Sequence, residues 1–292
     1  MEDKNLTGGC FRKKVLTIAG SDCSGGAGIQ ADLKTIAAHK LYGMSAITSL
    51  TAQNTTGVYG ISDVTPEFLE KQLDCIFNDI VPDAVKIGMV SNKELIEVIA
   101  RKLRQYHAKN IVLDPVMVST SGSNLLQEEA VKALVENLMP IADMITPNIP
   151  EAEVLSGNSI HQKKEVLEAV KIIFDKLEDV YQHLEDTFIL SKKRAILLKG
   201  GHHCDTADDM LYYNGKHIWF RGEKIKNPNT HGTGCTLSSA IACNLAMGYT
   251  MEQAVGAAKQ YVSGAIRAGL NIGTGKGPLN HMYNVNVVRE HG

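Results

Sequence analysis

The chain has 292 residues, 44% hydrophobic and 21% charged, which allows one large globular domain or two small ones. A formal net charge of -2 without a Lys/Arg block argues against nucleic-acid binding and a membrane-surface role. No apolar run approaches the roughly 20 residues that a membrane-spanning helix needs. We expect a polar tail over residues 1–13 and a single domain over residues 14–288.

Short apolar runs alternate with amphipathic segments along most of the chain. The predicted strands are Val15–Ala19, Ala46–Thr51, Ala84–Ile87, Ile111–Leu113, Met144–Ile145 and Ala195–Leu198. The predicted helices between and after them are Ile29–Lys40, Pro66–Asp79, Asn92–His107, Gln127–Met139, Lys163–Leu184, Thr236–Met247 and Met251–Ala268. The strands are apolar without strict alternation, as strands covered on both faces are. This order predicts an α/β fold in which helices cover both faces of a mainly parallel sheet.

Two further patterns refine this prediction. Asn214-Gly215 between Met210–Tyr213 and Lys216–Phe220 predicts a late β-hairpin, because Asn-Gly suits a two-residue turn. The helix predicted after residue 163 has an apolar stripe with 4, 3, 4, 3, 4 spacing, formed by Val166, Val170, Ile173, Leu177, Val180 and Leu184. The stripe fits a helix that covers the sheet, and it also fits a lengthened helix that contacts another subunit.

The six cysteines lack Cys-x-x-Cys spacing. They are Cys10, Cys23, Cys75, Cys204, Cys235 and Cys243, and the pattern is typical of reduced thiols in a cytoplasmic protein. The run His202-His203-Cys204-Asp205 resembles metal ligands, but adjacent ligands seldom form a tetrahedral site without a second pair. We therefore do not expect a zinc site.

Polar or glycine residues follow each predicted strand. In chain order they are Gly20-Ser21-Asp22, Ala52-Gln53-Asn54, Gly88-Met89, Asp114-Pro115-Val116, Thr146-Pro147-Asn148 and Lys199-Gly200-Gly201. Ligands of open α/β sheets bind at the carboxyl ends of the strands. The repetition of such residues predicts a functional site at this edge of the sheet.

The segment Gly232-Thr233-Gly234-Cys235 predicts an anion site. Its glycines permit a tight turn, and the helix that follows adds free N–H donors and a partial positive charge. Two common phosphate motifs fail, since Gly26 stands where a P-loop has its lysine and the third glycine of a dinucleotide fingerprint is missing after Gly234. Asp32 lies at the edge of an apolar helix stripe, where it either is a helix-terminal carboxylate or binds a small polar heterocycle.

The ordered motifs resemble the hydroxymethylpyrimidine/phosphomethylpyrimidine kinases of thiamine biosynthesis, which belong to the ribokinase-like superfamily. The resemblance covers roughly residues 14–283 and implies a three-layer α/β/α fold. Its motifs here are residues 20–32, Ala52-Gln53-Asn54-Thr55, Lys86-Ile87-Gly88-Met89, Asp114-Pro115-Val116-Met117, residues 146–152, Lys199-Gly200-Gly201-His202 and His231-Gly232-Thr233-Gly234-Cys235.

The resemblance also implies residue roles. A backbone group of Gly20 and the side chains of Asp32 and Gln53 would hold the pyrimidine, between apolar walls formed by Met89 and Val116. The amides of Gly232, Thr233, Gly234 and Cys235 would face the transferring phosphate of ATP. Cys235 stands where many ribokinase-like enzymes carry an aspartate base. A thiol at a helix N-terminus has a lowered pKa, so we expect Cys235 to accept the proton of the substrate alcohol.

The remaining implied roles concern the nucleotide and the metal. Asn148 and Glu151 match an Asn-x-x-Glu motif near Mg²⁺, partly through water, and Asp114 would share that task. Lys199 would place a positive charge at the ATP phosphates, and Asn148 and Thr233 would also bind ATP.

The expected activity is ATP-dependent phosphorylation of 4-amino-5-hydroxymethyl-2-methylpyrimidine, and then of its monophosphate to the pyrophosphate. The alternatives are a pyridoxal kinase of the same superfamily and a non-enzymatic protein that binds the ligand without consuming ATP. We expect a cytoplasmic homodimer whose partners are the small pyrimidine and ATP.

Overall fold

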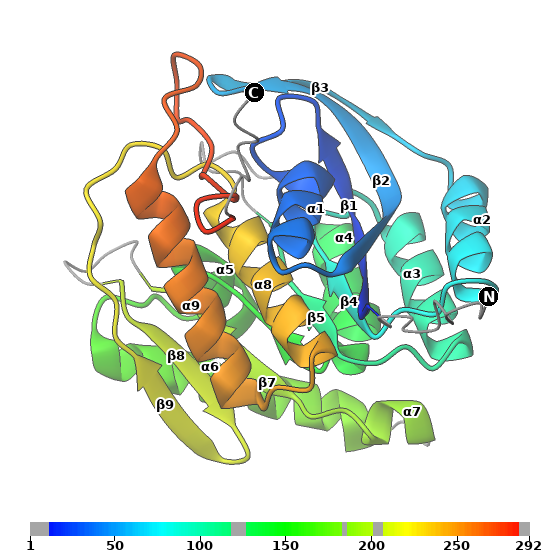
Figure 1. The fold of residues 1–292 in the computed structure, drawn as a ribbon. Helices are drawn as coiled ribbons and strands as arrows, with labels where there is room; N and C mark the ends of the chain where they lie inside the picture. The colour runs from blue at the N-terminus through cyan, green and yellow to red at the C-terminus, as the bar shows by residue number, and fades with distance from the viewer. Residues whose placement is uncertain (1–11, 118–126, 183–185, 201–206, 286–292) are drawn as a thin grey trace, which may run out of the picture.

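The computed structural model describes residues 12–117, 127–182, 186–200 and 207–285. Within these ranges the chain forms a nine-stranded sheet with helices on both faces (Figure 1). The strands are β1 Lys14–Asp22, β2 Tyr42–Asn54, β3 Gly57–Asp63, β4 Ala84–Ile87, β5 Ile111–Leu113, β6 Met144–Ile145, β7 Ala195–Leu198, β8 Asp209–Tyr213 and β9 Lys216–Phe220. Their order in the sheet is β3-β2-β1-β4-β5-β6-β7-β8-β9.

The sheet is parallel from β2 to β7 and antiparallel at both edges. Strand β3 pairs antiparallel with β2, and β8 and β9 form the predicted hairpin. Asn214 and Gly215 have φ angles of 52° and 71°, the conformation that a tight hairpin turn with two left-handed residues requires. The prediction of a mainly parallel sheet with a late hairpin is confirmed.

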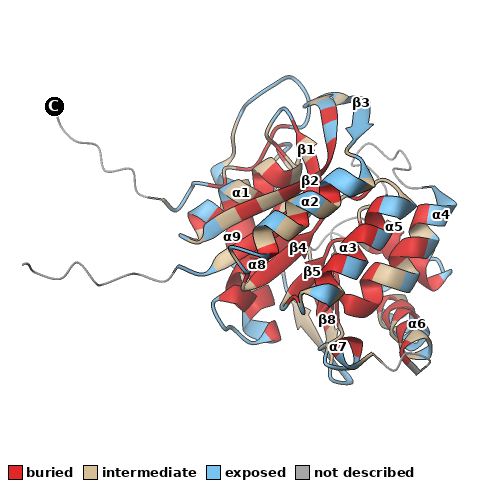
Figure 2. Ribbon diagram, turned by 90° about the vertical axis from the view of Figure 1, so that its right-hand side faces the viewer, coloured by how far each residue is buried: buried red, intermediate tan, exposed pale blue. Residues whose placement is uncertain are grey.

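The helices are α1 Gly28–Ala38, α2 Pro66–Phe77, α3 Lys93–Gln105, α4 Glu128–Ala133, α5 Ile149–Ser156, α6 Lys163–Gln182, α7 Thr187–Leu190, α8 Thr233–Ala246 and α9 Met251–Ala268. Helices α1, α8 and α9 cover one face of the sheet, and α2 to α6 cover the other (Figures 1 and 2). Successive strand residues point to opposite faces of the sheet. Val15 therefore packs in the core beneath α1, α8 and α9, and Leu16 packs in the core beneath α2 to α6. This arrangement confirms the predicted three layers.

The predicted strands and most of the predicted helices are present, with three differences. Strand β3 and the short helices α5 and α7 were not predicted. The helix predicted over Gln127–Met139 ends at Ala133 and continues as a π-helical turn, Leu134–Leu138, and a 3₁₀ turn, Met139–Ile141. Pro140 lies in that last turn, and a proline removes the N–H group that an α-helix would need there.

The apolar stripe of α6 packs against the sheet. Val166, Val170, Ile173 and Leu177 are buried in the core that α6 shares with α5, and Val180 is half-buried. This burial supports the interpretation of α6 as a covering helix. Leu184, the last residue of the stripe, lies outside the described residues.

The chain reverses its direction of travel through the sheet at β1. Strand β2 lies on one side of β1, and β4 lies on the other. Such a reversal separates the loops that leave the two neighbouring strands and opens a crevice between them. The loops after β1 and β4 therefore flank the position where a ligand of this fold would bind.

Two other sequence expectations are addressed within the described ranges. Cys23, Cys75, Cys235 and Cys243 are free thiols, whereas Cys10 and Cys204 lie outside these ranges, as does the whole of residues 202–205. Among the described helices, none has the length and apolar character that crossing a bilayer requires.

Candidate active site

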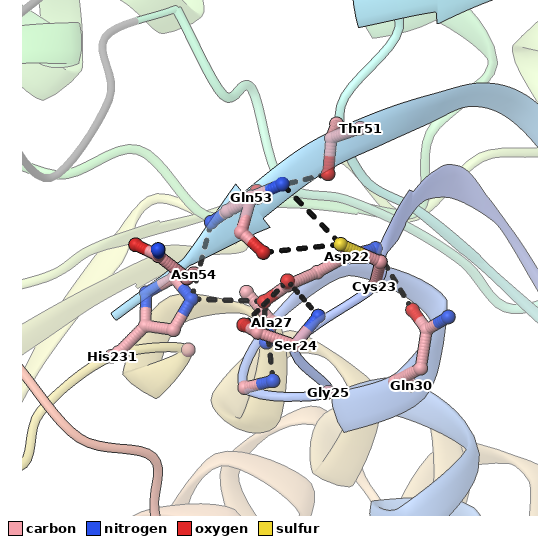
Figure 3. A network of polar contacts seen from close by, with 12 residues as sticks. Asp22, Cys23, Ser24, Gly25, Ala27, Gln30, Thr51, Gln53, Asn54 and His231 are labelled. Atoms are coloured by element: carbon pink, nitrogen blue, oxygen red, sulfur yellow. Dashed lines mark hydrogen bonds and ion pairs between the residues drawn. The ribbon is translucent and has the colours of Figure 1, made fainter. Parts of the chain in front are cut away.

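The carboxyl ends of the strands meet the start of α8, where the predicted anion loop lies. A Cβ atom added to Gly234 would stand 3.4 Å from both Asp114 Oδ2 and Lys199 Nζ. His231 lies against Asp22 and Gln53 on the other side of the loop (Figure 3). The structure thus brings together residues that the sequence places at four different strand ends and at one helix start.

The anion loop has the backbone geometry that its glycines suggest. Gly232 is the N-cap of α8 with a φ of 83°, and as a glycine it has no side chain that could cap the helix. A Cβ on Gly232 would also collide with the carbonyl oxygen of Gly26, so only glycine fits there. Helix α8 begins at Thr233, whose N–H group donates to the Thr230 carbonyl at 3.3 Å. The N–H groups of Gly234 and Cys235 have no acceptor within the helix and are available to an anion. The Thr233 hydroxyl itself donates to the Thr230 carbonyl.

Lys199 connects two buried carboxylates. Its Nζ lies 2.6 Å from Asp114 Oδ1 and 4.0 Å from Glu151 Oε2. Burial favours the neutral form of Asp114, but the charges of Lys199 and Lys86 outweigh it and lower the pKa of Asp114. Burial raises the pKa of Glu151, and the opposing charge of Lys199 does not cancel this effect. The result is a charged Asp114–Lys199 pair beside a carboxyl group that takes up a proton easily.

Helix α5 fixes the position of Glu151. The Asn148 side chain accepts from the Glu151 amide, and the Glu151 carboxylate accepts from the Asn148 amide, which forms a reciprocal cap. Asn148 also bridges to Lys199 through the backbone. The Asn-x-x-Glu motif therefore has a structural role in starting α5 next to the lysine.

Asp32 differs from its expected role. Neither Asp32 nor Lys86 has an exposed side-chain atom, and the Lys86 ammonium lies 2.8 Å from Asp32 Oδ2. The hydroxyls of Thr17 and Ser239 donate to the same carboxylate at 2.6 Å and 2.7 Å. Both oxygens are thus occupied by protein groups, so we withdraw Asp32 as a direct pyrimidine ligand. Its carboxylate does need a partner, as expected, but that partner is Lys86.

Cys235 also differs from expectation. Burial raises the pKa of its thiol, although the charge of Lys86 and a hydrogen bond from the Gly28 amide act in the opposite direction. The prediction of a lowered pKa was wrong, because it considered the helix N-terminus and omitted the loss of water around the sulfur. The Gly28 contact places the thiol against the loop that follows β1.

The other predicted substrate residues come from the ends of neighbouring strands: Gly20 from β1, Gln53 from β2, Met89 after β4 and Val116 after β5. Gly20 is buried, and a Cβ there would stand 2.7 Å from Met89 Cε and 2.8 Å from Ser49 Oγ. Met89, Gln53 and Val116 are half-buried. Their partial exposure leaves apolar and amide surface that a planar ring can contact.

Three residues of the site had no assigned role in the sequence. Asp22 accepts hydrogen bonds from Ser24, Gly26 and Ala27 and so closes the loop after β1. Lys86 is the one charged residue in the apolar strand Ala84–Ile87, which is a detectable signal, because a lysine covered on both faces needs a partner. His231 lies beside Gly232, and its contact with Asp22 joins residues 209 positions apart.

A glycine turn at a helix start, with a thiol and a buried lysine–carboxylate pair beside it, suits a kinase that transfers a phosphoryl group to a small molecule. The comparison with known families agrees. Residues 22–280 match the family described as phosphomethylpyrimidine kinase, and the chain belongs to this family.

Individual relatives are similar over nearly the whole chain. The hydroxymethylpyrimidine/phosphomethylpyrimidine kinase of Haemophilus influenzae is 42% identical over 276 residues, which are 92% of this chain and 96% of that protein. The thiamine biosynthesis bifunctional protein ThiED of Geobacter sulfurreducens is 45% identical over 96% of this chain. The chain spans only 54% of the length of that bifunctional protein.

A solved structure supports the fold and shows what a related site binds. The pyridoxal kinase from Staphylococcus aureus in complex with AMP-PCP and pyridoxal has a TM-score of 0.81 and 32% sequence identity. The alignment covers 94% of each chain. That protein holds a nucleotide analogue and a small alcohol together.

Proposed function

We propose that the protein phosphorylates 4-amino-5-hydroxymethyl-2-methylpyrimidine with ATP, and then phosphorylates the monophosphate to the pyrophosphate. The observation that carries this proposal is the anion loop Gly232–Cys235, whose thiol and free amides lie beside Asp114 and Lys199. The membership in the phosphomethylpyrimidine kinase family supports the choice of substrate. The matching of residues 22–280 also supports a single kinase domain over residues 14–288.

In this proposal the thiolate form of Cys235 accepts the proton of the substrate alcohol while the oxygen attacks the terminal phosphorus of ATP, whose bond to ADP breaks so that ADP leaves. The amides of Gly232, Gly234 and Cys235 stabilise the charge that spreads over the phosphoryl oxygens. The Thr233 amide, expected to join them, already donates to the Thr230 carbonyl. The same amides serve the second step, in which a phosphate oxygen is the nucleophile and needs no base. The loss of Cys235 therefore affects the first step more strongly than the second.

Asp114, Glu151 and Lys199 form the polyphosphate side of the site. Lys199 has one carboxylate partner at 2.6 Å, and its positive charge faces the loop that would hold the transferring phosphate. Asn148 would contact the nucleotide from the start of α5, whereas the amide and hydroxyl of Thr233 already donate to the Thr230 carbonyl. With these contacts the phosphates would lie between α5 and α8.

The residues present suit Mg²⁺. Asp114 and Glu151 offer carboxylate oxygens, and Mg²⁺ prefers oxygen ligands while keeping several of its waters. Within the described ranges no cluster of three or more His, Cys, Asp or Glu could hold a metal ion by itself. Two carboxylates fit an ion that is bound jointly with ATP, and such an ion would neutralise phosphate charge during transfer.

The alternative activity is phosphorylation of pyridoxal, which the Staphylococcus aureus structure favours because its protein binds pyridoxal on a similar fold. The relatives named for the pyrimidine are more similar to this chain, at 42% identity against 32%. A coupled ATP assay that measures kcat/KM for the pyrimidine alcohol, its monophosphate and pyridoxal tests the choice. Turnover of neither pyrimidine compound by the pure protein would refute the proposal, and preference for pyridoxal would establish the alternative.

We further propose a homodimer in the cytoplasm. The edge formed by β2 and β3 exposes several large apolar side chains: Tyr42, Leu50, Val58, Tyr59 and Ile61. An exposed apolar sheet edge is a typical contact surface for a second copy. Light scattering of the wild type and of Tyr59→Glu tests this, with a dimer expected only for the wild type. The free thiols of the described cysteines support a reducing compartment.

A further inference from the structure

The loop after β1, the end of β2 and the anion loop meet at one histidine. His231 Nε2 lies 3.0 Å from Asp22 Oδ2 and 3.3 Å from Gln53 Nε2 (Figure 3). The backbone of His231 is also fixed, because its amide donates to the Gly277 carbonyl. The next residue, Gly232, begins the anion loop, so the placement of His231 bears directly on the direction of the phosphate-binding amides.

Asp22 provides a rigid anchor for this histidine. It is 3% exposed, and it accepts from the amides of Ser24, Gly26 and Ala27 and from the Ser24 hydroxyl. Burial favours its neutral form, but the hydrogen bonds from His231 and Ser24 outweigh this effect and hold the pKa of Asp22 well below its usual range. An ionised carboxylate only accepts hydrogen bonds, so His231 must carry a hydrogen on Nε2.

The hydrogen on Nε2 also determines how the Gln53 amide is oriented. One end of the amide lies 3.3 Å from His231 Nε2, and the other lies 3.1 Å from Thr51 Oγ1. The hydrogen of the Thr51 hydroxyl goes to the Ser21 carbonyl, which leaves its oxygen free to accept. The contacts become compatible when the amide is turned over, so that the Gln53 oxygen shares the His231 Nε2 hydrogen with Asp22 and the NH₂ group faces Thr51.

The glycines at the contact show how closely the loop after β1 and the anion loop pack together. A Cβ on Gly26 would collide with the His231 ring, and a Cβ on Gly232 would collide with the Gly26 carbonyl. The His231 ring thus packs against the backbone of the loop after β1, and the backbones of the two loops pack against each other at Gly232 and Gly26. At the far end of the same contact, the Gly28 amide donates to the Cys235 thiol. A shift between the loops would move both the phosphate-binding amides and the sulfur.

We propose that His231 is a positioning residue for phosphoryl transfer, which through its Nε2–H bond to Asp22 holds the anion loop in register with the substrate loop. This inference rests on the proposed kinase activity. The loss of the bond would lower kcat by about 10²-fold, as a misplacement of about 1 Å does in other sites. The KM for ATP would stay near the wild-type value, because the Asp114–Lys199 pair is untouched.

The test compares His231→Phe, which keeps the ring volume, with His231→Gln, which restores an N–H donor near the Nε2 position. The matched control is His217→Phe on β9, where the histidine is exposed. We expect a large loss of kcat in His231→Phe and no loss in the control. The kcat of His231→Gln should be within about tenfold of the wild-type value, since one hydrogen bond to Asp22 remains. Unchanged kcat in His231→Phe, or equal losses in both variants, would overturn the proposal.

A second measurement does not depend on any variant or on turnover. Nitrogen-15 NMR of the histidine rings in the wild type should place the His231 hydrogen on Nε2 near neutral pH. A neutral ring with its hydrogen on Nδ1 would overturn the proposal even if the variants failed to fold. Absence of wild-type turnover would instead refute the kinase activity, while the NMR result would still decide whether the Asp22 bond exists.

Discussion

The Lys86 ammonium and the Asp32 carboxylate form an ion pair of 2.8 Å in which neither side chain is exposed. The pair joins β4 to α1 directly beneath the site. Burial would lower the pKa of Lys86, but the Asp32 charge outweighs this effect and raises it. The Lys86 ammonium therefore stays charged in the interior, where the removal of its carboxylate partner leaves it without compensation.

From this pair we predict a strong, non-additive effect on stability. Lys86→Met should lower the free energy of unfolding by about 3–5 kcal/mol, the usual cost of an uncompensated buried charge. The double variant Lys86→Met/Asp32→Leu should lose less than the sum of the single losses, because no buried charge remains. Urea denaturation of the wild type, Lys86→Met, Asp32→Leu and the double variant measures the two single losses and the combined loss. Additive losses would contradict an energetic link between the residues.

The Cys235 thiol provides the next prediction. Cys235→Ala should lower kcat for the pyrimidine alcohol by about 10²–10⁴-fold, the range for loss of a general base, while pyrimidine binding is kept. The second step, on the monophosphate, should lose less. Cys75→Ala is the matched control, since Cys75 is an exposed cysteine away from the site. Wild-type turnover by Cys235→Ala would remove the thiol from the mechanism.

The raised pKa of Cys235 predicts the pH dependence of the first step. The base is the thiolate, and its fraction rises with pH up to the pKa, so kcat/KM for the alcohol should increase from neutral into alkaline solution. In Cys235→Asp the carboxylate is ionised at much lower pH, so the rising part of the profile should move to acidic solution. The measurement is a pH–rate profile of both proteins. A wild-type profile that is flat through neutral and alkaline pH would argue against thiolate catalysis.

The sequence predicts the parts of the fold and site that depend on local pattern. The apolar strands, the Asn214-Gly215 turn and the glycines before α8 follow from spacing and residue type, and the structure confirms these features. Strand β3 escapes prediction because its residues are almost all exposed, so no buried face gives it a pattern. The partner of Asp32 and the pKa of Cys235 depend on contacts between distant segments, which a single sequence does not display.

The same distinction applies to the histidines. His231 and His281 are unremarkable as sequence, yet His231 directly precedes the anion loop and His281 contacts Thr236, the residue that directly follows it. His281 Nε2 lies 2.9 Å from Thr236 Oγ1, and the Thr236 hydroxyl donates to the Gly232 carbonyl. The neutral tautomer with its hydrogen on Nε2 donates to the Thr236 oxygen. His281 is 3% exposed, and its contact with Thr236 supports the first turn of α8.

The last prediction concerns acid stability. Burial, with a smaller effect from Lys34, lowers the pKa of His281 from 6.5 to about 4. In the unfolded chain the ring takes up its proton near pH 6.5, whereas in the folded protein it does so only near pH 4. Its contribution to stability is thus complete above about pH 6.5 and is lost as the pH falls toward 4, a change of about 3 kcal/mol.

His281→Gln keeps a donor toward Thr236 and removes the titrating group. Compared with the wild type by urea denaturation at neutral pH and near pH 4.5, it should lose less stability on acidification, because the other acid-sensitive groups are common to both proteins. His217→Gln, a change at an exposed histidine, should follow the wild type. If His281→Gln and the wild type lost stability in parallel, the ring would have to titrate alike in the folded and unfolded states. The support of α8 would then not require a neutral histidine.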